Sequence, residues 1–305
     1  TYNYEKTAKP MSEVMPKGVR WIKDFASGFN PENNSVSTKS SGNITYDYLV
    51  VAPGLAYDMS LVPGLGEALD KGVVCSNYTD PKHTWDVIKN FKGGTALFTQ
   101  PTTPIKCGGA PQKIMYLAES YFRKKDIREK TNVVFATAGS VIFGVKPIAN
   151  TLMEVVDRKD INLRFHHKLV EIDGKNKIAW YELGKDISAG GCVVMSGESD
   201  SKYIDETFQH NYKNVKVAVK DGRYGIHYDM LHTAPPSVAP KFVQDSPLVN
   251  EAKWLDVDHH TMQHNKYPNI FGLGDVAALP TAKTGAAIRK QVPVVVNNIV
   301  LLLNH

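Results

Sequence analysis

A cysteine in a loop rich in proline and glycine is the residue of this sequence best placed to do chemistry. Cys107 follows Lys106 and lies between an apolar strand predicted over residues 95–99 and a helix predicted over residues 112–124. The partial positive charge of a helix N-terminus and the Lys106 ammonium both favour a thiolate over a thiol. Two glycines after the cysteine leave room for a flat ligand. The pattern predicts a redox or nucleophilic thiol beside a cofactor, and the alternative is a buried structural cysteine.

A second group of residues with chemical potential lies near the end of the sequence. Residues 269–275 form an apolar strand that ends in Gly274 and Asp275. In open α/β sheets ligands bind at the carboxyl ends of the strands, where an ionised aspartate accepts hydrogen bonds from sugar hydroxyls. A helix rich in small residues begins near Lys283 and Thr284, and its N-terminus would favour negative charge on a flavin ring. The alternative is that Asp275 only caps a turn.

A nicotinamide-binding motif is missing from the turn where it is expected. The turn after the strand predicted over residues 132–137 contains one glycine, Gly139, and bulky residues follow at positions 141–143. A pyrophosphate does not lie easily against such a backbone. This part of the sequence therefore predicts a dinucleotide-type fold that does not hold NAD.

Strands and helices alternate along most of the sequence, which is typical of parallel sheets covered by helices on both faces. The 305 residues, 42% hydrophobic and 22% charged, suit a globular α/β protein of two domains. Strands are predicted over residues 19–25, 35–39, 45–52, 95–99, 132–137, 162–165, 168–172, 214–219, 225–231 and 269–275. Helices are predicted over residues 80–91, 112–124, 145–158 and from 283 on, with Asp80 as an N-cap before Pro81.

Composition also disfavours several kinds of partner and site. The net charge is +5, but the basic residues are dispersed, which disfavours nucleic acid as a partner. The three cysteines, Cys75, Cys107 and Cys192, cannot form a disulfide framework. The histidines at positions 259, 260 and 264 lack a carboxylate shell, and we expect surface histidines there rather than a metal site.

The last predicted helix is apolar, although no run of 18 apolar residues predicts a membrane span. Residues 294–296 and 299–303 are predicted to face the core, and contact with a membrane surface is the alternative. Pro293 is predicted to kink or break this helix.

Two blocks of this sequence resemble one family. Residues 104–124 and 267–287, with support from residues 228–236, resemble the sulfide:quinone oxidoreductases of mitochondrial type, members of the flavin disulfide reductase superfamily. The resemblance covers most of the chain and implies two Rossmann-like domains of the FAD/NAD(P)-binding type.

The same resemblance implies the domain organisation. Residues 1–79 and 228–305 would form the FAD-binding domain, and residues 80–227 would form a second domain without a nicotinamide site. A polar stretch over about 184–214, rich in glycine and serine, would be a flexible insertion. The N-terminal βαβ unit that carries the family's pyrophosphate loop does not occur in this sequence, so we expect a fragment.

The resemblance also implies roles for single residues. Cys107 matches one of the family's redox cysteines, which carries a persulfide after sulfide attack, and Asp275 matches the aspartate that contacts the FAD ribityl chain. The other positions assigned to the cofactor site are Ala52, Pro53, Gly54, Pro104, Lys106, Gly274, Lys283 and Thr284.

The resemblance also implies a reaction and its partners. Electrons pass from sulfide through FAD to a membrane quinone, and the sulfane sulfur leaves to a small acceptor, at the surface of the mitochondrial inner membrane. One departure matters: Val276 stands where the family has its second redox cysteine. The alternative is therefore a non-catalytic homologue with a structural or interaction role. An NADH-dependent flavin reductase is disfavoured by residues 139–144.

Overall fold

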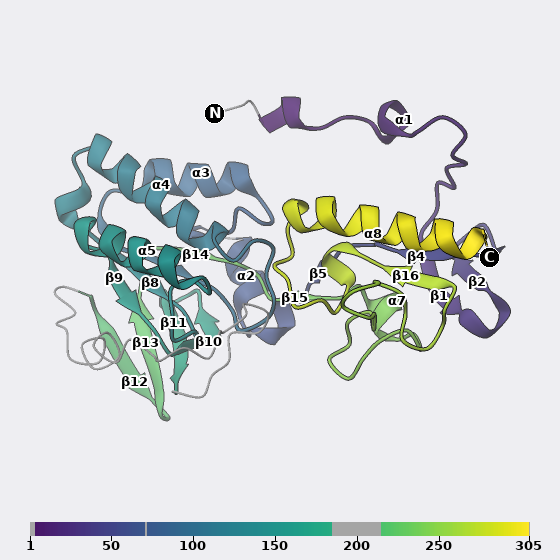
Figure 1. The fold of residues 1–305 in the computed structure, drawn as a ribbon. Helices are drawn as coiled ribbons and strands as arrows, with labels where there is room; N and C mark the ends of the chain where they lie inside the picture. The colour runs from purple at the N-terminus through teal and green to yellow at the C-terminus, as the bar shows by residue number, and fades with distance from the viewer. Residues whose placement is uncertain (1–3, 71, 185–214, 305) are drawn as a thin grey trace.

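The structure, a computed structural model, describes residues 4–70, 72–184 and 215–304. Two lobes stand side by side in Figure 1. The predicted insertion over 184–214, and Cys192 with it, lies outside the described residues except for residue 184.

The first lobe is built on a parallel sheet of five strands in the order β6-β14-β7-β8-β9. Successive apolar side chains of its strands alternate between its two faces because neighbouring strand residues point to opposite sides. Phe98 and Phe135 pack with the helices on one face, while Leu97 and Val134 pack on the other. The strands are β6 (Val74–Cys75), β7 (Gly94–Thr99), β8 (Thr131–Ala136), β9 (Asn162–Arg164) and β14 (Met230–Thr233).

The three longer helices of this lobe cover one face of this sheet, and on the other face the only helix among the described residues is the short α2 (Leu65–Leu69). The other face packs on an antiparallel sheet of order β10-β11-β13-β12, whose Tyr181 and Ile226 share a core with Leu97. The helices are α2 (Leu65–Leu69), α3 (Pro81–Asn90), α4 (Ala110–Lys124) and α5 (Lys146–Arg158). The antiparallel strands are β10 (His167–Asp173), β11 (Ile178–Leu183), β12 (Val217–Lys220) and β13 (Arg223–His227).

The second lobe combines small sheets with the long C-terminal helix α8 (Gly285–Leu303). Its parallel pair, β4 (Leu49–Val51) with β16 (Ile270–Gly272), joins segments from opposite ends of the chain. The remaining elements are α1 (Met11–Val14), β1 (Ala26–Asn30), β2 (Ser35–Thr38), β3 (Asn43–Thr45), β5 (Ala56–Tyr57), β15 (Ser237–Val238) and α7 (Lys241–Gln244). The predicted strand over 19–25 is wrong, since the first strand begins at Ala26.

The domain boundaries at residues 79 and 228 stay a prediction. Strands β6 and β14 fall outside the range 80–227, yet both pair within the parallel sheet of that lobe. The side chains of Val62 and Leu65 also belong to the core of this lobe.

Helix α8 differs from its prediction in two respects. It continues through Pro293, so the predicted break does not occur, and its apolar residues do not all face the core. Val295 is buried, but Val296 is 54% exposed and Leu303 is 65% exposed. With 19 residues and a mean hydropathy of 1.4, α8 is long and apolar enough to cross a membrane by length and composition.

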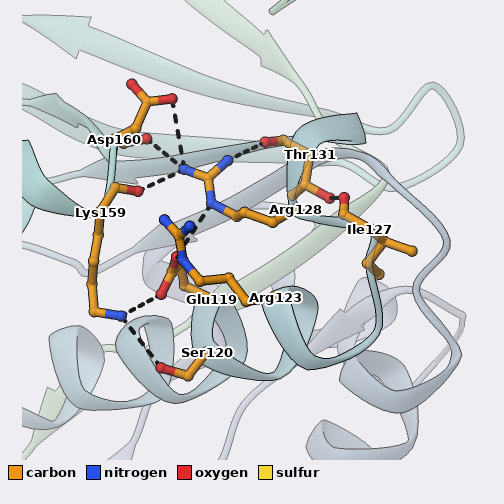
Figure 2. Close-up of polar contacts among 8 residues, drawn as sticks. All are labelled: Glu119, Ser120, Arg123, Ile127, Arg128, Thr131, Lys159 and Asp160. Carbon is orange, nitrogen blue, oxygen red and sulfur yellow. Dashed lines mark hydrogen bonds and ion pairs between the residues drawn. The ribbon is translucent and has the colours of Figure 1, made fainter.

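A buried carboxylate fixes α4, the helix that follows the Cys107 loop. Glu119 is fully buried and pairs with Arg123, one turn further along α4, and with Lys159 at the end of α5 (Figure 2). The Nε atom of Arg128 lies 3.4 Å from the same carboxylate. These charge-assisted contacts lower the pKa of Glu119, although its burial opposes this. One acidic group therefore ties α4 to α5 and to the turn before β8.

Candidate functional site

The parallel pair of β4 and β16 brings two predicted cofactor segments to one sheet edge. Ala52, Pro53 and Gly54 follow β4, and Gly274 and Asp275 follow β16. The Leu273 amide donates to the Val51 carbonyl at 3.4 Å, which continues the pairing to this edge. Because both strands are parallel, their carboxyl ends lie together, as α/β ligand sites require.

Two glycines shape the backbone at this edge. Gly54 and Gly274 both have φ of +78°, a conformation that residues with a Cβ rarely adopt. A Cβ on Gly54 would meet nothing within 4 Å, so its position is open to a ligand. The Gly274 amide donates to the Oε1 atom of Gln291, a buried residue of α8, at 2.8 Å. The turn that carries Asp275 is thus fixed by the helix behind it.

The Cys107 loop reaches the same place from the other lobe. Lys106 forms a parallel β-bridge with Lys283, and the Cys107 amide donates to the Lys283 carbonyl at 3.2 Å. The Nζ atom of Lys106 lies 3.6 Å from the Asp275 carboxylate. The structure therefore places Cys107 and Asp275 at one site, although they are far apart in the sequence. Cys107 is exposed, whereas Cys75 is buried and burial raises its pKa to about 12.

Lys283 supports the Asp275 turn from within. Its ammonium donates to the carbonyls of Asp275, at 2.6 Å, and Ala277, at 3.2 Å, and lies 3.9 Å from the centre of the Trp254 ring. Burial lowers the pKa of Lys283 to about 8, and the Asp275 charge partly offsets this shift. The side chain of Lys283 is therefore occupied in holding the turn together.

The start of α8 adds a small pocket to the site, too narrow to admit a water molecule. Thr284 caps the helix by accepting from the Ala287 amide at 3.2 Å. The pocket is lined by Gly274, Ala277, Thr281, Ala282, Lys283, Thr284, Ala287 and Gln291. The free amides of the first turn of α8 and the Asp275 carboxylate thus offer both donors and acceptors to a ligand.

Pro104 belongs to the same loop as Cys107, and the residue before it, Thr103, attaches that loop to the second lobe. The Ser237 amide donates to the Thr103 hydroxyl at 3.0 Å. Val276, by contrast, is fully buried in the core beneath the site.

Sequence reasoning missed three residues of this site. Tyr78 donates its hydroxyl to the Lys106 carbonyl at 3.1 Å. Tyr57 lies near Asp275, whose charge contributes with burial to a raised tyrosine pKa. Gln291 holds Gly274. No local pattern marks these residues, because each acts through a partner distant in the sequence.

The histidines weighed as metal ligands lie apart from this site. His259 and His260 are exposed, as predicted. His264 is buried and pairs with the Leu248 carbonyl at 3.2 Å, so the prediction of a surface residue is wrong there. Its role is to join two loops of the second lobe.

Comparison with known proteins yields one consistent group of relatives. The chain is 39% identical over 308 residues to "Sulfide:quinone oxidoreductase, mitochondrial" of Dictyostelium discoideum, covering 100% of this chain and 60% of the relative. It is 38% identical over 294 residues to the protein of the same name from Mus musculus, covering 96% of this chain and 58% of the relative. This chain is a homologue of the mitochondrial sulfide:quinone oxidoreductases. It spans about 58–60% of the length of these curated relatives, and no family model matches it.

Solved structures agree on the fold. The X-ray structure of the sulfide:quinone oxidoreductase from Aquifex aeolicus superposes with a TM-score of 0.67 at 19% identity, covering 93% of this chain and 61% of that one. A chain in the cryo-EM structure of the Tetrahymena thermophila mitochondrial ATP synthase gives a TM-score of 0.68 at 24% identity, covering 96% of this chain and 65% of that one. The predicted fold of FAD/NAD(P)-dependent disulfide oxidoreductase type is confirmed.

Proposed function

We propose that this chain is the sulfide-oxidising part of a sulfide:quinone oxidoreductase, which moves two electrons from sulfide through FAD to a membrane quinone. The observation that carries the proposal is the β-bridge between Lys106 and Lys283, because it joins an exposed thiol to a sheet edge with an acidic turn. The names of the relatives supply the substrate class, and the mitochondrion as location.

The chemistry requires an oxidation at Cys107. Its thiolate and HS⁻ join through a new S–S bond and form a persulfide, which releases two electrons and one proton. FAD supplies the two-electron acceptor when it is bound, and the quinone finally takes the two electrons with two protons. A small nucleophile then removes the outer sulfur and restores the Cys107 thiolate.

The residues at the sheet edge suit a flavin dinucleotide. Asp275 would accept hydrogen bonds from the ribityl hydroxyls, because an ionised carboxylate has only acceptor sites. Ala52, Pro53 and Gly54 would lie along the cofactor where the Gly54 backbone is open. The first turn of α8, after Thr284, would stabilise negative charge on the ring. Lys106, beside the Asp275 carboxylate, would balance the charge of the thiolate.

The membrane surface is a further proposed partner. Val292, Val296 and Val300 recur at intervals of four along α8 and are 40–54% exposed. This spacing places them on one side of the helix, and Leu301, Leu302 and Leu303 extend the apolar end. These residues support contact with the apolar phase in which a quinone resides.

Val276 supports the second candidate, a non-catalytic homologue with a structural or interaction role. It occupies the position of the family's second redox cysteine, and its side chain is fully buried. Within residues 4–70, 72–184 and 215–304 the site holds a single thiol, Cys107, so these residues cannot form the disulfide on which the family relies.

Flavin spectroscopy with sulfide separates the two candidates. The purified chain is incubated with FAD and titrated anaerobically with sulfide, and the flavin absorbance is followed. We expect the flavin to bleach, and we expect a Cys107→Ser variant to bind flavin but to stay oxidised. A Cys75→Ala variant is the matched control, because that thiol is buried away from the site. A chain that binds FAD but bleaches equally without Cys107 contradicts the proposal, and a chain that binds FAD but is not bleached by sulfide supports the non-catalytic homologue.

A further inference from the structure

The backbone at Cys107 adopts a conformation that needs support. Its φ is +57°, in the left-handed region that residues with a Cβ seldom occupy. Such a conformation persists only where the surrounding structure determines it. The contacts that hold the two peptide groups flanking Cys107 therefore decide how the thiol is presented.

Three hydrogen bonds fix these peptide groups. The Cys107 amide donates to the Lys283 carbonyl at 3.2 Å, and the Cys107 carbonyl accepts from the Ala110 amide at 2.8 Å. The Lys106 carbonyl accepts from the Tyr78 hydroxyl at 3.1 Å. Tyr78 is thus the side chain that holds the peptide unit directly before the cysteine.

The segment that carries Tyr78 is itself well anchored. The Asn77 amide lies 3.2 Å from the Nε2 atom of His232, a buried residue of β14. The Tyr78 amide donates to the Ser76 hydroxyl at 3.3 Å, and the Asp80 amide donates to the Ser76 carbonyl at 2.9 Å. The Tyr78 hydroxyl therefore belongs to a segment that hydrogen bonds hold against the five-stranded parallel sheet.

We propose that Tyr78 is a positioning residue for the thiol chemistry: its hydroxyl holds the Lys106 carbonyl and so keeps Cys107 in the left-handed conformation at the site. The effect of Tyr78 on catalysis rests on the proposed function, whereas its effect on the backbone conformation of Cys107 does not.

The protonation of Tyr78 fits this role. Burial raises the tyrosine pKa above its ordinary range, and negative charge on Cys107 acts in the same direction. The phenol therefore keeps its proton, and remains a donor, over the whole working range of pH.

Hydrogen–deuterium exchange of a Tyr78→Phe variant tests the proposal without flavin or sulfide. We expect the amides of residues 107–110 to exchange about five-fold faster, which corresponds to the loss of one neutral hydrogen bond. Tyr48→Phe is the matched control, because the Tyr48 hydroxyl also donates to a backbone carbonyl, that of Leu302 at 3.3 Å, but on α8. Equal exchange in Tyr78→Phe and wild type, or equal acceleration in both variants, overturns the proposal.

A double-mutant cycle separates positioning from general loosening. Glycine adopts the left-handed conformation without strain, so in a Cys107→Gly background the Tyr78→Phe change should accelerate exchange less than two-fold. The same five-fold acceleration in both backgrounds would show that Tyr78 does not act through Cys107.

An activity measurement then links the role to the reaction. In the flavin-loaded chain, Tyr78→Phe should slow sulfide-dependent bleaching about five-fold and leave the Kd for FAD unchanged. If wild type does not bleach, the proposed function fails, while the exchange experiment still decides the role of Tyr78.

Discussion

The Glu119 cluster gives the sharpest prediction, because one buried carboxylate holds three cationic side chains. A Glu119→Gln variant keeps the shape of the side chain but removes its charge. Removing one partner of a buried ion pair costs about 3–5 kcal/mol. Arg123 is half exposed, so water replaces part of the lost interaction there, but Arg128 and Lys159 are only 12% and 20% exposed. We therefore expect a loss of about 3 kcal/mol in the free energy of unfolding.

The assay is urea denaturation at pH 7, followed by far-ultraviolet circular dichroism. Glu182→Gln is the matched control, because Glu182 pairs with Lys168 at 2.9 Å while both side chains are exposed by 39–48%. Exposed pairs of this kind contribute about 0.5 kcal/mol. A loss below about 1 kcal/mol for Glu119→Gln, or equal losses in the two variants, would refute the reasoning.

The pH dependence of the loss tests its electrostatic origin. The pKa of Glu119 in the folded chain lies below its ordinary value of 4.5. Its stabilising contribution is therefore complete above about pH 4.5 and disappears as the pH falls through the lower pKa of the folded state. Glutamine does not titrate, so the difference between wild type and Glu119→Gln should shrink below pH 4.5. A constant difference would mean that packing, not charge, is responsible.

Three further predictions concern the site and the backbone. Acetylation of Lys283, followed by mass spectrometry, should reach its half-maximal rate near pH 8, whereas ordinary lysines do so near their pKa of about 10.4. In the Asp275→Asn variant the midpoint pH of Lys283 acetylation should fall further, because the Asp275 carboxylate raises the pKa of Lys283. An unchanged midpoint would mean that the Asp275 carboxylate and the Lys283 ammonium do not interact. Gly64→Ala should destabilise the chain by more than about 2 kcal/mol in thermal unfolding, since its Cβ would lie 2.0 Å from the Ile172 carbonyl oxygen, while Gly222→Ala, with open space around it, should cost only about 1 kcal/mol. Equal losses for the two glycines would contradict the steric argument.

Local sequence patterns placed most elements of the fold. The Asp80 cap is confirmed: its carboxylate accepts from the His83 amide at 2.9 Å, and Pro81 begins α3. Apolar runs predicted β7 and β8 to within one residue at either end. These signals succeed because capping, proline geometry and continuous burial act over a few neighbouring residues.

The errors arise where packing overrides the local pattern. Residues 19–25 alternate like a strand but form none, since a strand also needs a partner with which to pair. The apolar residues of α8 suggested a core helix, yet a helix buries only the face that packs on a neighbouring element, and Val296 is 54% exposed. The sequence predicted strands near β10, β12 and β13, but no local pattern indicated that they form an antiparallel sheet over one face of the parallel sheet.

The order of amino acids alone specifies the chemical groups of the candidate site and the turns that carry them: a thiol before a helix, and a carboxylate after an apolar strand. These groups come together only on folding, through the pairing of Lys106 with Lys283 and the hydrogen bond from Tyr78. The difference lies in the distance along the chain over which each interaction acts. Backbone preference is set by adjacent residues, whereas these contacts join segments from two lobes, and their geometry depends on the packing of everything between them.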